Sequence, residues 1–313
     1  MKTLVLGAAI VDIIMKIPRL PKSGEDILCT ERKLTIGGCA YNVSNILRSF
    51  NVKHDLFVPV GCGIYADIIR RELNEDGYEI LINDLEKDNG YCLCLVEENG
   101  ERSFITVNGI EANHKKEWFH NLNMNQYENI YLAGYQLCGD KSDIVVDWLL
   151  NQSDKNIFFA PGPVINISKN TLEKIFSINP ILHLNEKEAL EFTKKDNIND
   201  SILRLYELTK NVVFITLGER GVIFYNGKNI THIEGEKVKV VDTIGAGDSH
   251  IGTIISAYSL WADKMNFNCS WSNYLNENND FIKGCKLANK IASEVVQVQG
   301  SKISKECFNK SNI

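Results

Sequence analysis

Short apolar runs alternate with helical patterns along most of this chain of 313 residues. Runs such as 3–9 and Ile181–Asn185 contain no Asp, Glu, Lys or Arg, as expected for strands that are covered on both faces. The stretches between such runs repeat apolar side chains at helical spacing, as in 39–50. Strands that alternate with helices of about 10 to 15 residues form parallel βαβ units. The sequence therefore predicts a three-layer α/β/α fold around a mostly parallel central sheet.

The predicted strands and helices follow one another in order. Strands are expected at 3–9, 54–61, 129–135, 156–161, 181–185 and 212–218. Helices are expected at 39–50, 65–76, 141–151, 171–178, 186–193, 201–210, 250–261 and 281–298. The Asn-rich stretch 266–279 is expected to be a loop or a short insertion. Because no repeat and no linker is visible, we expect residues 1–313 to form a single domain.

Two stretches break this alternation and are expected to form a small β-sheet lid. Residues 13–36 contain two prolines and a glycine before a β-like run. Residues 89–110 contain two strand-like runs joined by Glu98-Asn99-Gly100, which favours a hairpin turn. Ligands bind beyond the carboxyl ends of the strands in open α/β sheets, so such a flap is expected to cover a site there.

Composition and charge limit the partners of the protein. The net charge of −6 argues against a nucleic-acid partner, and the longest apolar runs are too short to cross a membrane. The apolar alternation of Tyr91, Leu93 and Leu95 gives the predicted lid an apolar face, and a homodimer that pairs two lids is a hypothesis.

The N-terminus and the cysteines bear on the location. Asp12 interrupts the N-terminal apolar run, which favours a buried first strand over a signal peptide. The nine cysteines form no CxxC pair and have no histidines at zinc spacing. We therefore expect reduced, buried thiols and a cytoplasmic location.

A glycine-rich turn combines an anion site with a carboxylate. After β-forming valines at 238, 240 and 241, Gly245 and Gly247 flank Ala246, and Asp248 follows immediately before a helical pattern. Glycines allow a positive φ and close approach to a ligand, and free amides at 245–248 would attract an anion to the helix N-terminus. Since a carboxylate repels a phosphate, Asp248 is expected to accept a proton from an attacking alcohol. A helix-capping Asp is the alternative.

Two further strand ends carry groups suited to a nucleotide. Asn185 and Glu188 follow one strand and could hold hydrated Mg²⁺ and phosphate oxygens, although Glu188 could be an ordinary first-turn acid. The turn with Thr216, Gly218 and Gly221 follows the next strand and lets phosphates lie over backbone, although a plain β-turn would look the same.

The N-terminal part supplies groups suited to a polyhydroxyl ligand. Asp12 follows the first strand, and Gly37, Gly38 and Asn42 lie at the start of a helix. Acid and amide groups at strand ends can bind hydroxyls, and a solvated turn is the alternative.

Together these motifs resemble the ribokinase (PfkB) family of carbohydrate kinases from residue 1 to about 304. The family's DTxGAGD signature is matched by Asp242 to Asp248, its Gly-Gly and Asn by Gly37, Gly38 and Asn42, its NxxE motif by Asn185 and Glu188, and its TxGxxG turn by Thr216, Gly218 and Gly221. The sequence departs from the family pattern at two positions in the region that decides the substrate. Cys39 stands where relatives often have a polar residue, and Ala160 stands in place of an Asp.

The resemblance implies a role for each matching residue. Asp248 would be the general base, and the amides of Gly245, Ala246 and Gly247 would hold the transferring phosphoryl group. The residues that would contact ATP are Asn185, Thr216, Gly218, Gly221, Gly247 and Asn289. Asn185 and Glu188 would hold Mg²⁺, partly through water. The residues that would bind the acceptor are Asp12, Gly37, Gly38, Asn42, Gln136 and Asp248. A monovalent cation, K⁺, would lie against Asp242, Ile244, Val295, Val298, Gly300 and Ser304, mostly through backbone carbonyls.

The expected reaction is ATP-dependent phosphorylation of a primary hydroxyl on an unphosphorylated, ribose-like sugar or a nucleoside. A sugar phosphate would need a clamping Arg or Lys. Alternation allows only one of Arg32 and Lys33 to face inward, and Arg102 is expected in a turn. Aromatic side chains that could either stack on a base or pack in the lid and core are Tyr41, Phe104 and Tyr135.

Two other functions are weighed against the kinase. A catalytically weak regulatory member of the same fold is disfavoured because Asp248 and the glycines are retained. A nucleotide-dependent oxidoreductase is disfavoured because no GxGxxG follows the first strand.

Overall fold

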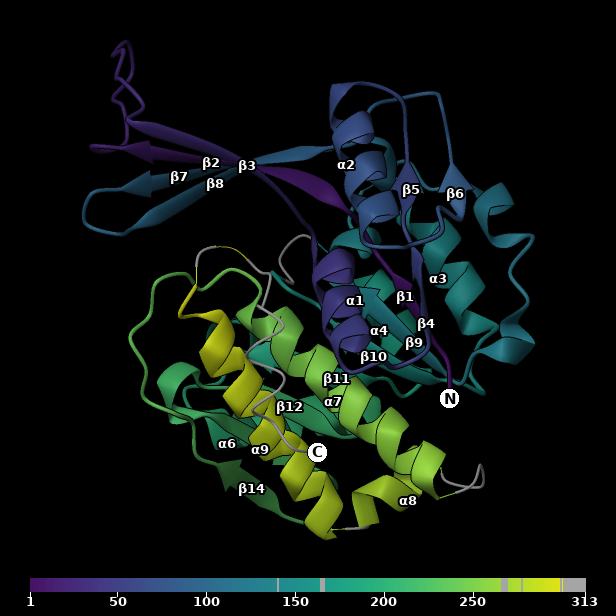
Figure 1. Cartoon of the computed structure of the whole chain (residues 1–313). Helices are drawn as coiled ribbons and strands as arrows, with labels where there is room; N and C mark the ends of the chain where they lie inside the picture. Colours follow the sequence, from purple (N-terminus) through teal and green to yellow (C-terminus); the bar gives the residue numbers. More distant parts are fainter. Residues whose placement is uncertain (140, 164–166, 266–269, 277, 299, 301–313) are drawn as a thin grey trace.

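In the part of the chain that the structure describes, a sheet of eight strands lies between two layers of helices (Figure 1). The structure is a computed structural model, and it describes all residues except 140, 164–166, 266–269, 277, 299 and 301–313. In spatial order the strands are β14 (Ile230–Ile233), β13 (Val222–Tyr225), β12 (Val213–Thr216), β11 (Ile181–Asn185), β10 (Asn156–Ala160), β9 (Asn129–Ala133), β1 (Thr3–Leu6) and β4 (His54–Phe57). The pairs from β4 to β12 are parallel, and β13 and β14 form an antiparallel edge. The predicted α/β architecture is confirmed.

The helices cover both faces of the sheet because the strands are apolar on both sides. In β1, Val5 packs into one core cluster, whereas Leu4 and Leu6 pack into the other. The first cluster includes side chains of α1 (Cys39–Ser49), α2 (Ile64–Glu75), α7 (Ala246–Lys264), α8 (Trp271–Asn276) and α9 (Asn278–Val295). The second includes side chains of α3 (Ser142–Leu150), α4 (Lys169–Phe176), α5 (Glu186–Thr193) and α6 (Ile198–Thr209).

A separate sheet of four strands projects from this body (Figure 1). Its spatial order is β3 (Glu31–Gly37), β2 (Ile10–Ile17), β7 (Tyr91–Glu97) and β8 (Arg102–Val107). The predicted hairpin turn closes with a bond of 2.8 Å from the Gly100 amide to the Glu97 carbonyl. The small β-sheet predicted from the sequence is therefore present, and we refer to it as the lid sheet.

Strand alternation gives the lid sheet two different faces. On one face, which we call inner, Asp12 lies in register with Cys92, and Cys92 with Thr106. On the opposite, outer face, Ile13 lies in register with both Leu34 and Leu93. In these rows the inner face carries Asp12 and Thr106, whereas the outer face carries only apolar side chains.

Several local predictions are wrong. The strand expected at 54–61 is split into β4 and β5 (Pro59–Val60), and β5 pairs with β6 (Ile82–Asn83) in a small sheet of its own. The Asn-rich stretch contains the helix α8, and the strands β13 and β14 were not anticipated. Val240 and Val241, which are β-forming residues, lie outside any strand and are 56% and 51% exposed, because the last strand, β14, already ends at Ile233.

Two observations concern the expected location. None of the helices in the described residues has the length and apolar character needed to cross a bilayer. The cysteines that the structure describes are free thiols.

Candidate active site

The predicted site residues converge at the carboxyl edge of the central sheet, next to the lid sheet. Asn185 ends β11 and is in register with Thr216 at the end of β12. The charge of Asp248 acts on both Glu188 and Asp12. Residues from four separate sequence motifs therefore lie around one carboxylate.

Asp248 lies in the first turn of α7 and is held by two side chains from α1. Gly245 precedes the helix with a φ of 77°, a left-handed conformation that glycine adopts without strain. Asn42 donates from Nδ2 to Asp248 Oδ2 over 2.8 Å, and the Cys39 thiol also hydrogen-bonds to the carboxylate. The first turn of α1 therefore fixes the orientation of the Asp248 side chain.

The environment of Asp248 makes it a better proton acceptor than an ordinary aspartate. Burial raises its pKa to about 6, against the opposing hydrogen bonds from Asn42 and Cys39. Burial and the charge of Asp248 raise the pKa of Cys39 well above its usual value, so that thiol stays protonated and acts as the donor. At neutral pH Asp248 is mostly ionised but binds a proton more readily than a solvated aspartate would.

The backbone of the glycine turn partly matches the expected anion site. Among the described residues, the amides of Gly247 and Asp248 have no recorded hydrogen-bond partner. The amide of Ala246 donates to the Thr243 carbonyl at 3.3 Å, so the prediction of a free amide is wrong at Ala246. Gly247 has no positive φ, contrary to expectation, and a Cβ placed there would meet nothing within 4 Å. The missing side chain leaves open space beside the free amides.

Asp12 lies on the inner face of the lid sheet, packed directly against Gly37. A Cβ on Gly37 would collide with the Asp12 carboxylate, so only glycine allows this approach. Burial, followed by the charges of Asp242 and Asp248, raises the pKa of Asp12 to about 7. The group is therefore part protonated at neutral pH and can both accept from and donate to a hydroxyl. Gly38 is the N-cap of α1, which carries Asn42.

Asn185 and Glu188 form a capping box at the start of α5. Asn185 Oδ1 accepts from the Glu188 amide, and Glu188 Oε2 accepts from the Asn185 amide, each over 2.9 Å. Burial, and then the charge of Asp248, raise the pKa of Glu188. A cation near Glu188 would offset both the cost of burying its charge and the repulsion from Asp248. The described residues contain no group of three or more His, Cys, Asp or Glu side chains that could hold a metal.

The turn after β12 has one open glycine and one packed glycine. A Cβ on Gly218 would meet nothing within 4 Å, whereas one on Gly221 would collide with the backbone after β14. Thr216 Oγ1 donates to the Leu184 carbonyl over 3.4 Å. Asn289 Nδ2 donates to the carbonyls of Ile233 and Glu234 at 3.1 and 3.0 Å, so Asn289 holds the same backbone from α9.

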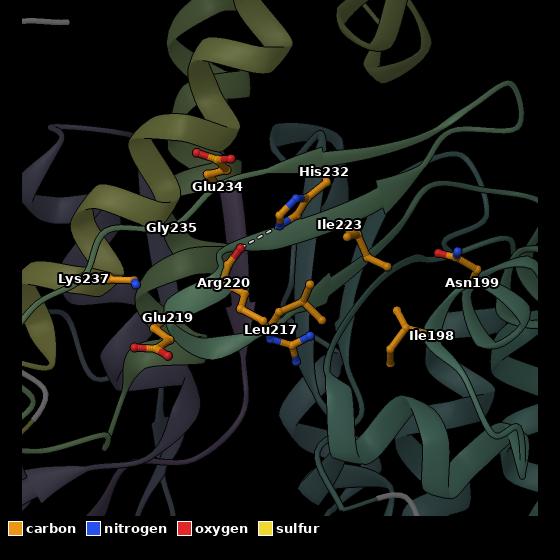
Figure 2. Close-up of a pocket in the computed structure, with 10 residues that line it drawn as sticks. All are labelled: Ile198, Asn199, Leu217, Glu219, Arg220, Ile223, His232, Glu234, Gly235 and Lys237. Atoms are coloured by element: carbon orange, nitrogen blue, oxygen red, sulfur yellow. Dashed lines mark hydrogen bonds between the residues drawn. The ribbon is translucent and has the colours of Figure 1, made fainter.

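A cavity of about 610 Å³ adjoins this turn. Figure 2 shows Leu217, Glu219 and Arg220 from the turn together with Gly235 and Lys237 from the chain after β14. His232 Nε2 and the Arg220 carbonyl lie 2.7 Å apart and join the two segments. None of the residues that line the cavity belongs to the turn before α7, which carries Gly245 and Gly247. The cavity therefore lies beside the expected nucleotide contacts and does not enclose Asp248.

The residues expected near the acceptor differ in where they lie. Tyr41 is fully buried and donates to Asp76 over 2.6 Å, so the prediction that it could stack on a base is wrong. Gln136 is 3% exposed, and no contact in the described residues joins it to Asp12 or Asp248. Its neighbour Tyr135 is 54% exposed, and the charges of Cys39, Glu188 and Asp248 act on it. Phe104, at 55% exposed, shares the inner face of the lid sheet with Asp12.

Among the residues expected to bind K⁺, the side chain of Asp242 already has partners. Asp242 Oδ1 accepts from the Ile244 amide over 2.8 Å and from Arg102 Nη1, and Oδ2 accepts from the Gly300 amide over 2.9 Å. The Val295 carbonyl accepts from the Val298 amide over 3.2 Å. Ser304 lies outside the described residues. A guanidinium therefore lies against the Asp242 carboxylate, whereas most of the expected K⁺ contacts were backbone carbonyls.

Two functional contacts were missed from the sequence. Cys39 was noted only as a departure from a pattern, yet its thiol bonds to Asp248. Arg102 was expected in a turn, yet it begins β8 and faces inward. Counting alternate residues from the hairpin turn would have placed Arg102 on the inner face.

Comparisons with known proteins identify the family of the chain. The family described as pfkB family carbohydrate kinase matches residues 2–306. The uncharacterized sugar kinase YegV of Escherichia coli K12 is 32% identical over 258 residues, which cover 81% of this chain and 80% of that protein. The ribokinase of Dictyostelium discoideum is 26% identical over 98% of this chain and 97% of its own length. Among solved structures, the ribokinase from Giardia lamblia superposes with a TM-score of 0.83 at 20% identity, covering 98% of both chains.

Proposed function

Because the chain belongs to the pfkB family of carbohydrate kinases, we propose that it transfers the γ-phosphoryl group of ATP to a primary hydroxyl of an unphosphorylated sugar or nucleoside. That the chain is a kinase follows from its family and its named relatives. The general base, the anion site and the class of acceptor are our inference from the site.

The observation that carries the proposal is the position of Asp248. Its carboxylate is oriented by Asn42 and Cys39, has a pKa raised to about 6, and lies in the first turn of α7, where the amides of Gly247 and of Asp248 itself are free. Such a carboxylate can take the proton of a hydroxyl while the amides and the helix dipole attract the phosphoryl group that the hydroxyl attacks. The arrangement suits phosphoryl transfer, in which positioning and charge stabilisation supply most of the rate enhancement.

Asn42 and Asp12 prepare the acceptor side. Asn42 Nδ2 holds Oδ2 of Asp248, which restricts the rotation of the carboxylate and aims it at one hydroxyl. Asp12, with a pKa near 7, can accept from or donate to a second hydroxyl of the same ligand. Two hydroxyls at fixed positions favour a ligand with a sugar ring.

The donor side is formed by α5 and the turn after β12. Asn185 and Glu188 are the residues that would hold Mg²⁺, which would neutralise charge on the phosphates when bound. The bare backbone at Gly218 allows close approach of the nucleotide's phosphates. Asn289 would act on the adenine side through the backbone that it holds, rather than through its own Nδ2.

The described cations argue for an unphosphorylated acceptor. Arg102 faces inward, but it is paired with Asp242. Arg32 is in register with Met15 and so lies on the outer face. Lys33 is in register with Ile14 and lies on the inner face, but it is an exposed residue two positions beyond the row of Asp12. One exposed lysine is a poor clamp for a phosphate dianion.

A substrate screen tests this proposal. ADP formation is followed with Mg²⁺ and ATP against free pentoses, hexoses, nucleosides and their phosphorylated counterparts. We expect the highest kcat/KM with a free sugar or a nucleoside, and ³¹P NMR of the product should show a primary phosphate ester. A kcat/KM for a sugar phosphate well above that for every free sugar and nucleoside would refute the acceptor class. Absence of turnover with all of them would refute the proposed reaction.

A further inference from the structure

Arg102 on the lid sheet forms a buried ion pair with Asp242, on the loop that leads into the glycine turn. Its Nη1 contacts Asp242 Oδ1, and its Nη2 donates to the Val241 carbonyl over 3.2 Å. The Asp242 side chain is 2% exposed and that of Arg102 is 17% exposed. Figure 1 shows the lid strands projecting above this loop, so the pair bridges the lid sheet and the main body.

Asp242 organises the loop as well as binding the lid. Its Oδ1 also accepts from the Ile244 amide, and its Oδ2 accepts from the Gly300 amide, beyond the end of α9. One carboxylate therefore joins three segments: the start of the glycine turn, the chain after α9, and the lid strand β8. Without the guanidinium this buried carboxylate would have no counter-charge. It lies close enough to Asp12 to raise the pKa of Asp12.

A bound monovalent cation does not fit beside the Asp242 carboxylate. Both oxygens of Asp242 already accept hydrogen bonds, and one of them contacts a fixed positive charge. A second cation beside that guanidinium would be repelled. The Asp242 side chain, with a fixed positive charge beside it, therefore does not fit as a K⁺ ligand.

We propose that Arg102 is a positioning residue that latches the lid sheet over the site, and that its guanidinium supplies at Asp242 the positive charge otherwise expected from K⁺. When the lid is latched, the loop before α7 is held and the amides of Gly247 and Asp248 keep their direction. When the lid opens, the loop loses its counter-charge. The kinetic part of this proposal rests on the proposed kinase function, whereas the latch itself does not.

The latch is tested on the protein alone, without substrate. Hydrogen–deuterium exchange of peptides from β7 and β8 is compared between wild type, Arg102→Gln and Arg102→Lys. Arg32→Gln is the matched control, because it removes the same charge from the outer face of the same sheet. We expect several-fold faster exchange in Arg102→Gln, a smaller change in Arg102→Lys, and none in Arg32→Gln. Equal exchange in wild type and Arg102→Gln would overturn the latch, even if the protein proved to have a different activity.

The charge replacement is tested by turnover in K⁺, Na⁺ and tetramethylammonium buffers of equal ionic strength. We expect wild-type rates to agree within about twofold, as for a charge already built into the protein. We expect Arg102→Gln to lose on the order of 10²-fold in kcat/KM, the usual effect of a misplaced catalytic group, with partial recovery in K⁺ and in Arg102→Lys. Thermal unfolding of the substrate-free proteins should show stabilisation by K⁺ over tetramethylammonium only in Arg102→Gln. Wild type that needs K⁺ for activity, or gains stability from it as Arg102→Gln does, would overturn the replacement.

Discussion

His183 and His250 are joined by a hydrogen bond of 2.9 Å between Nε2 of the first and Nδ1 of the second, in the buried layer beneath the site. His183 lies on β11 two residues before Asn185, and His250 lies on α7 two residues after Asp248. The bond therefore connects the strand that carries the predicted Mg²⁺ residues to the helix that carries the candidate base. A hydrogen bond between two imidazoles needs at least one neutral ring as acceptor.

Acid should destabilise the protein through this pair. Burial lowers the pKa of His250 to about 4, and burial together with His250 lowers the pKa of His183 well below its usual value. In the unfolded chain both rings have a pKa near ~6.5, so below that pH the unfolded state binds protons that the folded state excludes. The stability that these rings contribute is therefore fully present above pH ~6.5 and is lost as the pH falls. For His250 the loss runs at about 1.4 kcal/mol per pH unit until the pH reaches about 4.

The contribution of His250 can be isolated by substitution. His250→Gln should unfold at a lower temperature than wild type at pH 7 but should lose less stability between pH 7 and pH 5. His232→Gln, which changes an exposed histidine, is the control and should keep the wild-type slope. Differential scanning calorimetry across this range measures the slopes, and equal slopes for His250→Gln and wild type would contradict the prediction.

Replacing Asp248 should abolish turnover without unfolding the protein. Asp248→Asn keeps the shape of the side chain but cannot accept the proton, and loss of a general base costs roughly 10²–10⁴-fold in rate. Asp67→Asn, at the exposed first turn of α2, is the matched control. The coupled ADP assay measures kcat, and circular dichroism checks the fold. More than a tenth of wild-type kcat in folded Asp248→Asn would remove Asp248 from the role of base.

Asp12 should bind the acceptor at a cost in stability. Its folded pKa of about 7 lies above its usual value of 3.8, so the folded state binds a proton that the unfolded state releases between these values. Stability from this group is therefore present at low pH and lost as the pH rises toward 7. Asp12→Asn, which stays neutral, should unfold at a higher temperature than wild type at pH 8, and by a clearly smaller margin at pH 5.

The same Asp12→Asn variant should have a KM for the acceptor raised more than its KM for ATP. This split distinguishes a ligand-binding role from a purely structural one, since both nucleotide and acceptor binding would suffer if the lid sheet were merely misfolded. Calorimetric unfolding at both pH values and initial-rate kinetics provide the two readouts. An unchanged acceptor KM would argue against contact with the acceptor, and a Tm difference independent of pH would argue against the raised pKa.

The sequence predicted elements and strand ends well because both depend on local pattern. The parallel strands β11 and β12 bring their carboxyl ends to one edge, so Asn185 and Thr216 could be placed together in advance. The contact between Cys39 and Asp248 could not, because it depends on how α1 packs against α7 across the first core cluster. For the same reason Val241 looked like part of a strand, although its amide bonds instead to the Val296 carbonyl after α9.

The outer face of the lid sheet is predicted to pair two copies of the chain. It is apolar across its width: Ile13 and Leu93 lie side by side at the centre, with Leu34 and Ile105 beside them on the edge strands. Leu34 is 45% exposed and Ile105 is 53% exposed. A contiguous apolar surface on a sheet with two open edges is costly in water, so a second lid sheet is a suitable cover.

Sedimentation equilibrium at micromolar concentration should detect a dimer, and Ile105→Glu should convert it to a monomer because a charge would be buried within the contact. Ile230→Glu is the matched control, since Ile230 is also an exposed isoleucine on an edge strand, β14, far from the lid sheet. If Ile105→Glu and Ile230→Glu dissociate the dimer equally, the contact lies elsewhere. A wild-type chain that is strictly monomeric at these concentrations would refute the dimer while leaving the lid sheet's part in catalysis unaffected, because Asp12 and Arg102 both lie on the opposite face.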